Sequence, residues 1–328
     1  MRKLHAALVL LVLLLSGLYI SFVAFNDISR TYRNFDRFDN ETGNKNGCYI
    51  VPNIVHFLRF NNPVLKFTEA VCLLAAFKNQ RPEKIMVHTN VNQTGKYWKI
   101  VKSLPGLSAV LMFVKVDIPE EIFGQKLNPG WKAFHASDVT RIRILMEYGG
   151  IFLDNDSYIV SSLNKFRRFE MALGWQPGKL LQNQVVVAHK DARFLKLWLE
   201  SYRDSYKPTL WYYNAGELPT RILEKRPFLV HKEPKLFGVY GVVRKIFETP
   251  FTEWRTYYAF HLMARHQFLF KNITKEATYP VKFNESNIHK YPIAFRDMVY
   301  DVYPYKTNIK NVQAKNKEKF KIKPKKPN

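Results

Sequence analysis

The chain has 328 residues, of which 47% are hydrophobic and 15% aromatic, so it is long and apolar enough to bury a sizeable core and is not a disordered chain. Its formal net charge of +24 makes nucleic acid, acidic membrane surfaces, nucleotide phosphates and acidic glycans the partners to weigh. Its two cysteines exclude a disulfide-dense scaffold and a cysteine-rich zinc site.

The N-terminal residues predict a membrane anchor. Residues 4–25 form one apolar stretch, and a membrane span needs about 20 such residues. Arg2 and Lys3 precede it, so residues 1–3 are expected to stay cytoplasmic and the bulk of the chain to be luminal or extracellular. A cleaved signal peptide is the alternative, but the best cleavage position, at Ala24, fits the small-x-small rule poorly.

The next segment, residues 26–48, is polar and without a sustained period, which is typical of a stem or linker. Cys48 and Cys72 could form one disulfide in an oxidising lumen, or Cys72 is a buried thiol in an apolar helix. Asn155 lies in an Asn-x-Ser triplet that we expect to stay unglycosylated. Four other glycosylation triplets fit a luminal chain, and they begin at Asn40, Asn92, Asn272 and Asn284.

A folded region is predicted over residues 49–305, because strand-like and helix-like segments alternate there. Strands are predicted at residues 49–60, 83–90, 109–119, 151–154, 171–176 and 184–190. Helices are predicted at residues 67–82, 95–106, 131–150 and 191–206. This alternation predicts an α/β fold with a mixed, mostly parallel sheet flanked by helices. From about residue 232 the pattern is irregular, and residues 306–328 predict a basic, disordered tail.

One predicted helix carries an acid and a base on the same face. If Ser137 or a near neighbour caps this helix, Asp138, Arg141 and Leu145 fall at helical spacing, whereas Arg143 does not. Asp138 and Arg141 then point together at one polar ligand, or they form an ordinary surface ion pair worth a few tenths of a kcal/mol, and the spacing leaves both interpretations open.

Two carboxylates follow at the carboxyl end of the next strand. Asp154 and Asp156 are one residue apart, so alternating side chains would place them on the same side and turn Asn155 away. Open α/β sheets bind ligands at this end of their strands. Two carboxylates directed at one point suit Mg²⁺ or Mn²⁺ holding phosphate oxygens, and a solvated turn is the alternative.

The segments HASDVTRIRILMEYGG and IFLDNDSYIV, which together make residues 135–160, resemble the DXD-containing sugar-binding region of a glycosyltransferase superfamily. This superfamily includes animal α-1,4-galactosyl- and α-1,4-N-acetylglucosaminyltransferases, a fungal α-1,6-mannosyltransferase and bacterial glucosyltransferase domains. A weaker resemblance extends from Val51 to about Leu223, roughly half of the chain.

The resemblance implies a GT-A-like, Rossmann-like fold, a nucleotide-sugar donor and Mn²⁺ or Mg²⁺. Carried onto this chain, Asp156 would bind the metal directly, and Asp154 would reach the metal and the ribose or donor sugar. Asp138 would accept hydrogen bonds from donor hydroxyls, and Arg141 would contact the sugar or a phosphate. The Gly149–Gly150 pair would let the helix turn sharply into the strand.

Three further positions are implied with less support from the residues themselves. His56 corresponds to a region that lines the nucleotide pocket, although a structural histidine fits it equally. His135 corresponds to an aromatic-or-histidine position that would contact the donor. Asn183 would lie near the anomeric carbon as a catalytic residue, but Gln184 replaces the glycine that often follows it in relatives.

These inferences predict a single-pass Golgi membrane protein whose luminal domain is a metal-dependent, retaining hexosyltransferase. It would move a hexose or N-acetylhexosamine from a nucleotide-sugar, such as a UDP-sugar, to a glycan on a glycolipid or glycoprotein. The alternatives are a glycan-binding protein of similar fold that has lost turnover, a phosphoryl- or nucleotidyl-transfer enzyme, and a basic nucleic-acid binder. The anchor and the glycosylation triplets disfavour the last two, and no P-loop or nucleic-acid motif occurs.

Overall fold

The computed structural model describes most of the chain between Phe35 and Pro304. The chain divides into two units, residues 1–39 and 40–328, and the first is described only at Phe35, Phe38 and Asp39. The predicted anchor, the basic tail and the triplet at Asn272 lie outside the described residues. In the part that is described, no helix is long and apolar enough to cross a membrane. The described residues are 35, 38–233, 237–238, 241–264 and 283–304.

The second unit is built on a seven-stranded mixed sheet with the order β10-β8-β9-β6-β1-β2-β3. β6, β1, β2 and β3 run parallel to one another, as do β10 and β8, while β9 is antiparallel to both of its neighbours. The predicted mixed, mostly parallel sheet is therefore confirmed. In sheet order the strands are β10 (His231–Glu233), β8 (Met171–Gly174), β9 (Gln182–Ala188), β6 (Gly150–Leu153), β1 (Ile54–Arg59), β2 (Lys84–Thr89) and β3 (Leu111–Lys115).

Two smaller pairings extend this framework. A three-stranded sheet has the order β11-β12-β7, in which β7 (Ser157–Ile159) pairs antiparallel with β12 (Ala259–His261) and β12 pairs parallel with β11 (Phe237–Gly238). A short hairpin joins β4 (Glu121–Ile122) to β5 (Gln125–Lys126). The β7–β12 pairing matters for the site, because it brings a late segment of the chain beside residues that follow β6.

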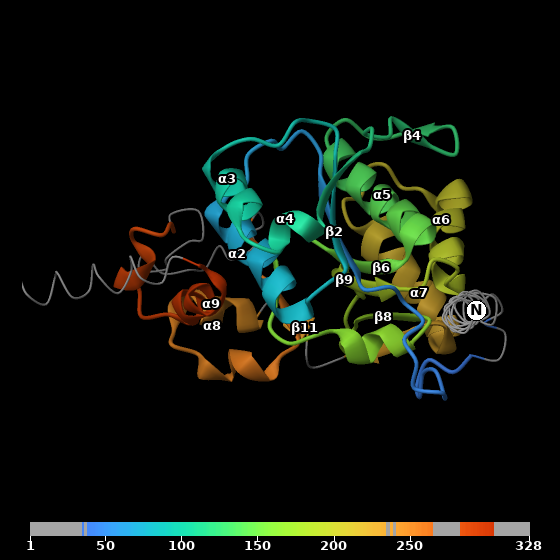
Figure 1. Ribbon diagram of the computed structural model, residues 1–328. Coiled ribbons are helices and arrows are strands. Elements are labelled where there is room, and N and C mark those ends of the chain that lie inside the picture. The colour runs from blue at the N-terminus through green and yellow to red at the C-terminus, as the bar shows by residue number, and fades with distance from the viewer. Residues whose placement is uncertain (1–34, 36–37, 234–236, 239–240, 265–282, 305–328) are drawn as a thin grey trace, which may run out of the picture. The chain divides into compact units, whose positions relative to one another are not determined.

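Helices cover both faces of the main sheet. α2, α3 and α4 lie on one side of it, and α5 and α6 pack together on the other (Figure 1). This division follows from right-handed crossovers, because the chain first builds β1, β2 and β3 in one direction and then returns through α5 to the opposite side of β1. The helices are α2 (Phe67–Ala75), α3 (Lys96–Ser103), α4 (Leu107–Val110), α5 (Lys132–Tyr148), α6 (Arg193–Ser205), α7 (Leu218–Lys225), α8 (Gly241–Glu248) and α9 (Ala294–Val302).

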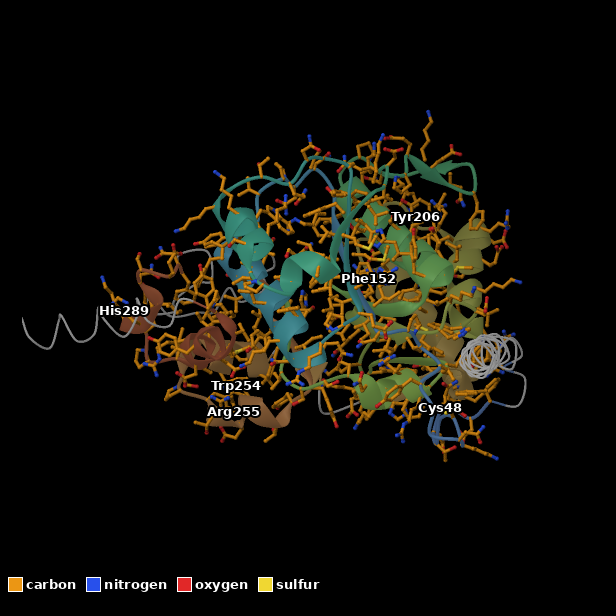
Figure 2. All side chains as sticks on the ribbon, viewed as in Figure 1. Cys48, Phe152, Tyr206, Trp254, Arg255 and His289 are labelled. Carbon is orange, nitrogen blue, oxygen red and sulfur yellow. The ribbon has the colours of Figure 1, made fainter. Side chains whose placement is uncertain are left out.

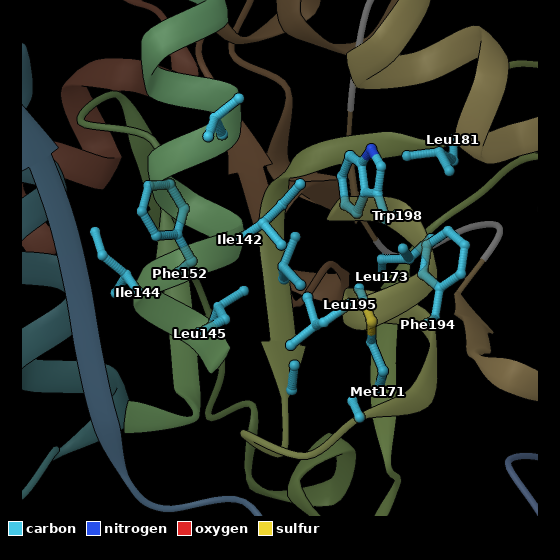
Figure 3. Close-up of a cluster of buried hydrophobic side chains, with 14 of the residues drawn as sticks. Ile142, Ile144, Leu145, Phe152, Met171, Leu173, Leu181, Phe194, Leu195 and Trp198 are labelled. Carbon is cyan, nitrogen blue, oxygen red and sulfur yellow. The ribbon is translucent and has the colours of Figure 1, made fainter. Parts of the chain in front are cut away.

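A buried apolar cluster joins α5 and α6 to the sheet (Figure 3). Ile142 and Leu145 of α5 meet Phe152 of β6 and Leu173 of β8, and Trp198 of α6 closes the cluster. A fully buried side chain of this size contributes about 1.5–3 kcal/mol to stability. The polar residues of α5 and β6 are therefore carried on elements that this packing holds in place.

The structure decides three local features. α5 begins at Lys132, so Ser137 lies inside the helix and does not cap it. Cys48 is exposed (Figure 2), Cys72 is buried in α2, and both are free thiols, so the alternative of a buried helical thiol at Cys72 is confirmed. Asn40 is buried, and its amide donates to Glu170 Oε2 at 3.2 Å, so its glycosylation triplet is not accessible and residue 40 belongs to the folded unit, not to a stem.

Candidate active site

α5 delivers an acid and a base to the carboxyl end of β6. Asp138 and Arg141 are buried on one face of the helix, whereas Arg143 is exposed as predicted. Arg141 Nη2 lies 3.5 Å from Asp138 Oδ1 and 3.0 Å from Asp154 Oδ1. The guanidinium therefore does more than pair along its own helix, since it links α5 to the residues that follow β6.

The two carboxylates of the DXD stretch lie in a turn and not in a strand. β6 ends at Leu153, and the amide of Ser157 donates to Asp154 O at 2.8 Å to close the turn. Asp154 is fixed from the other side, because its amide donates to Gln184 O of β9 at 2.9 Å. The side chain of Asp154 is 27% exposed and that of Asp156 is 9% exposed, so Asp154 is the more accessible of the pair.

Asn155, between the two aspartates, turns toward β1. Its amide donates to Leu58 O at 2.7 Å, and its side-chain oxygen accepts from Arg59 Nη1 at 3.1 Å. The same Arg59 nitrogen lies 3.1 Å from Glu69 Oε2, and this ion pair is almost fully buried. Asn155 thus holds the turn against the end of β1. Its amide is committed to a hydrogen bond within the fold, so it is not free to carry a glycan.

β12 brings a histidine to the same turn. His261 Nε2 lies 3.2 Å from Asp156 Oδ1 and 3.8 Å from Asp154 Oδ2. The amide of Ala264 also donates to Asp156 Oδ2 at 2.7 Å. Burial alone would lower the pKa of His261, but the charges of Asp156 and Asp154 outweigh burial and raise it. This contact could not be predicted from sequence patterns, because 105 positions separate His261 from Asp156.

β9 contributes Asn183 to the cluster. Its amide donates to Asp138 Oδ1 at 3.2 Å and to Ala215 O at 3.3 Å, and its backbone oxygen accepts from Arg141 Nη1. Burial raises the pKa of Asp138 to about 7, although Arg141 and Asn183 oppose that rise. The predicted residues Asp138, Arg141, Asn183 and Asp154 are therefore in mutual contact at one place.

The cluster holds more acid than base. Asp138, Asp154 and Asp156 supply three carboxylates, against one guanidinium from Arg141 and one imidazole from His261. Two polar atoms beside them, Arg141 Nε and the hydroxyl of Tyr202, are buried and have no hydrogen-bond partner in the described part of the molecule. Buried polar atoms without partners are costly, so their presence at this spot is typical of a site that a polar ligand completes.

These side chains fit a hard divalent cation. Two carboxylates and one imidazole nitrogen are the donor types that Mn²⁺ accepts, and Mg²⁺ accepts the carboxylates. Among the residues that the structure describes, no three His, Cys, Asp or Glu side chains form a preformed metal cage. Instead His261 bridges the carboxylates, so binding of a cation would require the imidazole to lose its Nε2 proton.

The structure does not bring His56 to this cluster. His56 is fully buried within β1, its Nε2 lies 2.8 Å from Gly149 O, and its Nδ1 lies 3.1 Å from His88 Nε2. Gly150 has φ +115°, and a Cβ there would lie 2.6 Å from Ile54 O and 2.9 Å from His56 Nε2. His56 therefore supports the glycine turn at the opposite end of β6, and this position corrects its expected place in the nucleotide pocket.

His135 lies near the cluster but is directed at another segment. It sits three positions before Asp138 on α5, and its Nδ1 lies 2.7 Å from the hydroxyl of Tyr206. His135 is buried, so we assign it to holding Tyr206 (Figure 2), just after α6, against α5.

Comparisons with known proteins find relatives among glycosyltransferases. Residues 72–172 match the family model described as the glycosyltransferase sugar-binding region containing the DXD motif. Glucan organizing enzyme 1 of Cryptococcus neoformans is 24% identical over 54% of this chain and 51% of its own length. Human lactosylceramide 4-alpha-galactosyltransferase is 28% identical over 27% of this chain and 24% of its own length. The chain thus spans about half the length, or less, of these relatives.

Solved glycosyltransferase structures resemble this chain more distantly. The galactosyltransferase LgtC, solved with donor and acceptor sugar analogues, matches with a TM-score of 0.38 and 12% identity over 63% of this chain and 86% of that one. The apo-form glycosyltransferase GlyE of Streptococcus pneumoniae matches with a TM-score of 0.42 and 10% identity over 81% of this chain and 64% of that one. The family model and the sequence relatives confirm the predicted resemblance, which the model match places over residues 72–172.

Proposed function

We propose that this chain, with its DXD-containing sugar-binding region, is a GT-A-like, metal-dependent retaining glycosyltransferase. It moves a hexose or N-acetylhexosamine from a nucleotide-sugar donor, in the first instance a UDP-sugar, to a glycan acceptor. The observation that carries the proposal is the gathering of Asp138, Asp154 and Asp156, in contact with Arg141 and His261, at the carboxyl end of β6. That end of an α/β sheet is where such folds bind ligands.

Each residue has a stated part in this proposal. Asp154, Asp156 and His261 hold the cation, which when bound offsets the carboxylate charge and stabilises the charge on the departing diphosphate. Arg141 orients a phosphate or sugar oxygen through its unpartnered Nε. Asp138 accepts a hydrogen bond from a donor-sugar hydroxyl, and Asn183 fixes the direction of that carboxylate.

The substitution proceeds on one face of the sugar. The bond between the anomeric carbon and the phosphate oxygen breaks, and the acceptor oxygen bonds to the same face of that carbon. The acceptor hydroxyl gives its proton to the departing phosphate oxygen. Among the described residues, no carboxylate of the cluster is free of Arg141, His261 and Asn183 to act as a covalent nucleophile. We therefore assign these groups to positioning and charge stabilisation.

Placement in the cell is a separate part of the proposal. The apolar residues 4–25 and the exposed triplet at Asn92 support a single-pass Golgi membrane protein whose folded unit is luminal. Treatment of the cell-expressed protein with a glycosidase should increase its electrophoretic mobility. An unchanged mobility would contradict the luminal placement.

The full-length protein should be assayed for hydrolysis of a panel of UDP-, GDP- and ADP-sugars with Mn²⁺, with Mg²⁺ and with excess chelator. We expect release of the nucleotide from one donor class, dependent on the cation and abolished by the chelator. Activity that the chelator leaves unchanged would overturn the metal assignment. Donor binding without any turnover, on calorimetry, would overturn the catalytic assignment and leave a glycan- or nucleotide-binding protein.

A further inference from the structure

An aromatic platform lies beside the candidate active site, and the proposed roles above do not use it. Trp131 and Trp211 stack with their ring centroids 6.3 Å apart and 25° between their planes, and Phe134 meets both rings edge-on at 5.9 and 6.0 Å. Tyr212 adds a fourth ring, 5.7 Å from Trp211. Large side chains in such a cluster are normally core residues, yet Phe134 is 38% exposed.

The platform continues the face of α5 that carries the charged site. Phe134, Asp138 and Arg141 are separated by four and three positions, which places them along one stripe of α5, and Trp131 is the residue just before the helix. At 1.5 Å per residue, Phe134 lies about 6 Å along the axis from Asp138. Arg141 and Asp138 are buried while Phe134 is exposed, so the stripe leads from the reaction centre outward to solvent.

The second half of the platform is fastened to the same centre. Tyr206, which precedes Trp211, bonds to His135 of α5 at 2.7 Å, and Ala215 O accepts from Asn183 at 3.3 Å. The hydroxyl of Tyr212 donates to Leu181 O at 2.9 Å. The segment that bears Trp211 and Tyr212 is thus held at one end by His135 of α5 and at the other by Asn183, which also contacts Asp138, so the rings are preorganised with respect to α5.

On the basis of the proposed function, we propose that the platform is the acceptor subsite and that it binds a pyranose ring of the glycan acceptor. The face of a pyranose presents C–H bonds that pack well against the electron-rich face of an aromatic ring, while its hydroxyls remain in water. A glycan, and not a lipid chain, is favoured because the platform is continuous with the sugar-transfer centre and only partly exposed. This arrangement would bring the reducing-side neighbour of the reacting acceptor sugar onto Phe134 and Trp211.

The test separates an aromatic contact from mere apolar bulk. Phe134→Leu keeps an apolar side chain but removes the ring, Phe134→Tyr keeps the ring, and Trp211→Leu probes the second half of the platform. Phe228→Leu is the matched control, because Phe228 is 56% exposed and lies on the η4 turn (Pro227–Leu229), outside the platform. Acceptor KM, kcat and acceptor-free donor hydrolysis are measured for each full-length variant.

We expect the acceptor KM to rise about 5- to 10-fold in Phe134→Leu and Trp211→Leu, which is the range for losing one aromatic pair. Phe134→Tyr and Phe228→Leu should leave it unchanged, and acceptor-free donor hydrolysis should not change in any variant. An unchanged acceptor KM in both leucine variants would overturn the assignment. A loss of donor hydrolysis equal to the loss of transfer would also overturn it, because the rings would then serve the donor site.

A binding measurement keeps the platform testable if no acceptor is turned over. Saturation-transfer NMR should detect binding of lactose, or of a mannose, glucose or N-acetylglucosamine oligosaccharide, that Phe134→Leu removes and Phe228→Leu retains. Absence of glycan binding, or binding only of uncharged lipid vesicles, would overturn the acceptor subsite. Failure of the wild-type protein to bind any nucleotide-sugar while the glycan still binds would instead contradict the proposed function alone.

Discussion

Both ends of β6 carry buried polar side chains, and the fold treats the two ends in opposite ways. At the amino end, the two ring nitrogens of His56 lie within hydrogen-bond distance of His88 Nε2 and Gly149 O. Burial lowers the pKa of His56 to about 4, and burial together with His56 lowers the pKa of His88 to about 3, so both rings are neutral near pH 7. Both ring nitrogens of His56 are therefore satisfied by other parts of the same chain.

At the carboxyl end, acidic side chains gather in the described part of the molecule. Arg141 contacts Asp138 and Asp154, His261 contacts Asp154 and Asp156, and the buried Arg141 Nε has no hydrogen-bond partner among the described residues. Buried histidines that hydrogen-bond to one another stabilise a fold, whereas buried carboxyl groups beside an unsatisfied donor suit a polar ligand or a cation. We therefore regard the first cluster as structural and the second as the functional candidate.

The largest effect is expected from breaking the carboxyl end. Asp156→Asn removes a charged donor while keeping its shape, and we expect nucleotide-sugar hydrolysis to fall about 100-fold or more because charge on the leaving diphosphate loses its stabilisation. Initial rates with saturating Mn²⁺ measure this. Asp191→Asn, an exposed aspartate outside the cluster, is the control and should retain full activity. Equal rates in the two variants would remove Asp156 from the site.

The packing at the amino end of β6 can be disrupted by adding one methyl group at Gly150. In Gly150→Ala the new Cβ meets backbone and His56 at under 3 Å, and φ is +115°, so the free energy of unfolding should fall by about 3 kcal/mol. Gly124→Ala shares the positive φ, at +76°, but has open space around it, and it should cost only about 1 kcal/mol. Urea unfolding compares them. Similar losses of unfolding free energy in the two variants would show that the close contacts of Gly150 with Ile54 O and His56 do not contribute to stability.

The buried groups at the two ends of β6 should change the free energy of unfolding with pH in opposite directions. Below the unfolded histidine pKa of about 6.5, the unfolded chain binds protons that buried His56 and His88 refuse, so stability falls as the pH drops toward 4. Asp138 keeps its proton up to a pKa of about 7 in the fold but releases it near 3.8 when unfolded. Its contribution is therefore full below about pH 3.8 and is lost as the pH rises through 7.

Two variants can separate the histidine and Asp138 contributions to the pH dependence of stability, measured on metal-free protein in the presence of a chelator. His88→Gln should flatten the acid side, and Asp138→Asn should flatten the loss between pH 4 and 7, with each titrating proton worth up to about 1.4 kcal/mol per pH unit. Thermal unfolding from pH 4 to 8 provides the measurement. An Asp138→Asn profile parallel to that of the wild type would show that Asp138 does not titrate in this range.

The smallest effect is expected at Asn155, which we predict to remain unglycosylated. Its amide is committed to Leu58 O, so peptide mapping of protein made in a secretory pathway should find residue 155 without a glycan. Asn92 is exposed and serves as the comparison within the same digest. A glycan on Asn155 would show that the turn opens toward solvent before the chain has folded, and it would contradict the tight seating of the DXD stretch against β1.

The sequence could predict the local half of the site but not the distant half. Asp138 and Arg141 follow from helical spacing, and Asp154 and Asp156 follow from their place after an apolar strand. The resemblance supplied Asn183. His261 could not be predicted, since it lies on a three-residue strand whose only signal is its pairing with β7, far earlier in the chain. In the same way, composition does not reveal that β9 inserts antiparallel between β6 and β8, because that order depends on packing between distant segments.

The pairing of β7 with β12 also sets when the site can exist. The ribosome completes β1 through β9, with Asp154 and Asp156 already in sequence, well before Ala259–His261 emerges. A nascent chain at that stage lacks both the imidazole and the amide of Ala264 that hold Asp156. The side chains of Asp154, Asp156 and His261, which we propose as metal ligands, therefore meet only late in synthesis. Under that proposal, unfinished chains that stop before residue 259 would be weak competitors for metal ions.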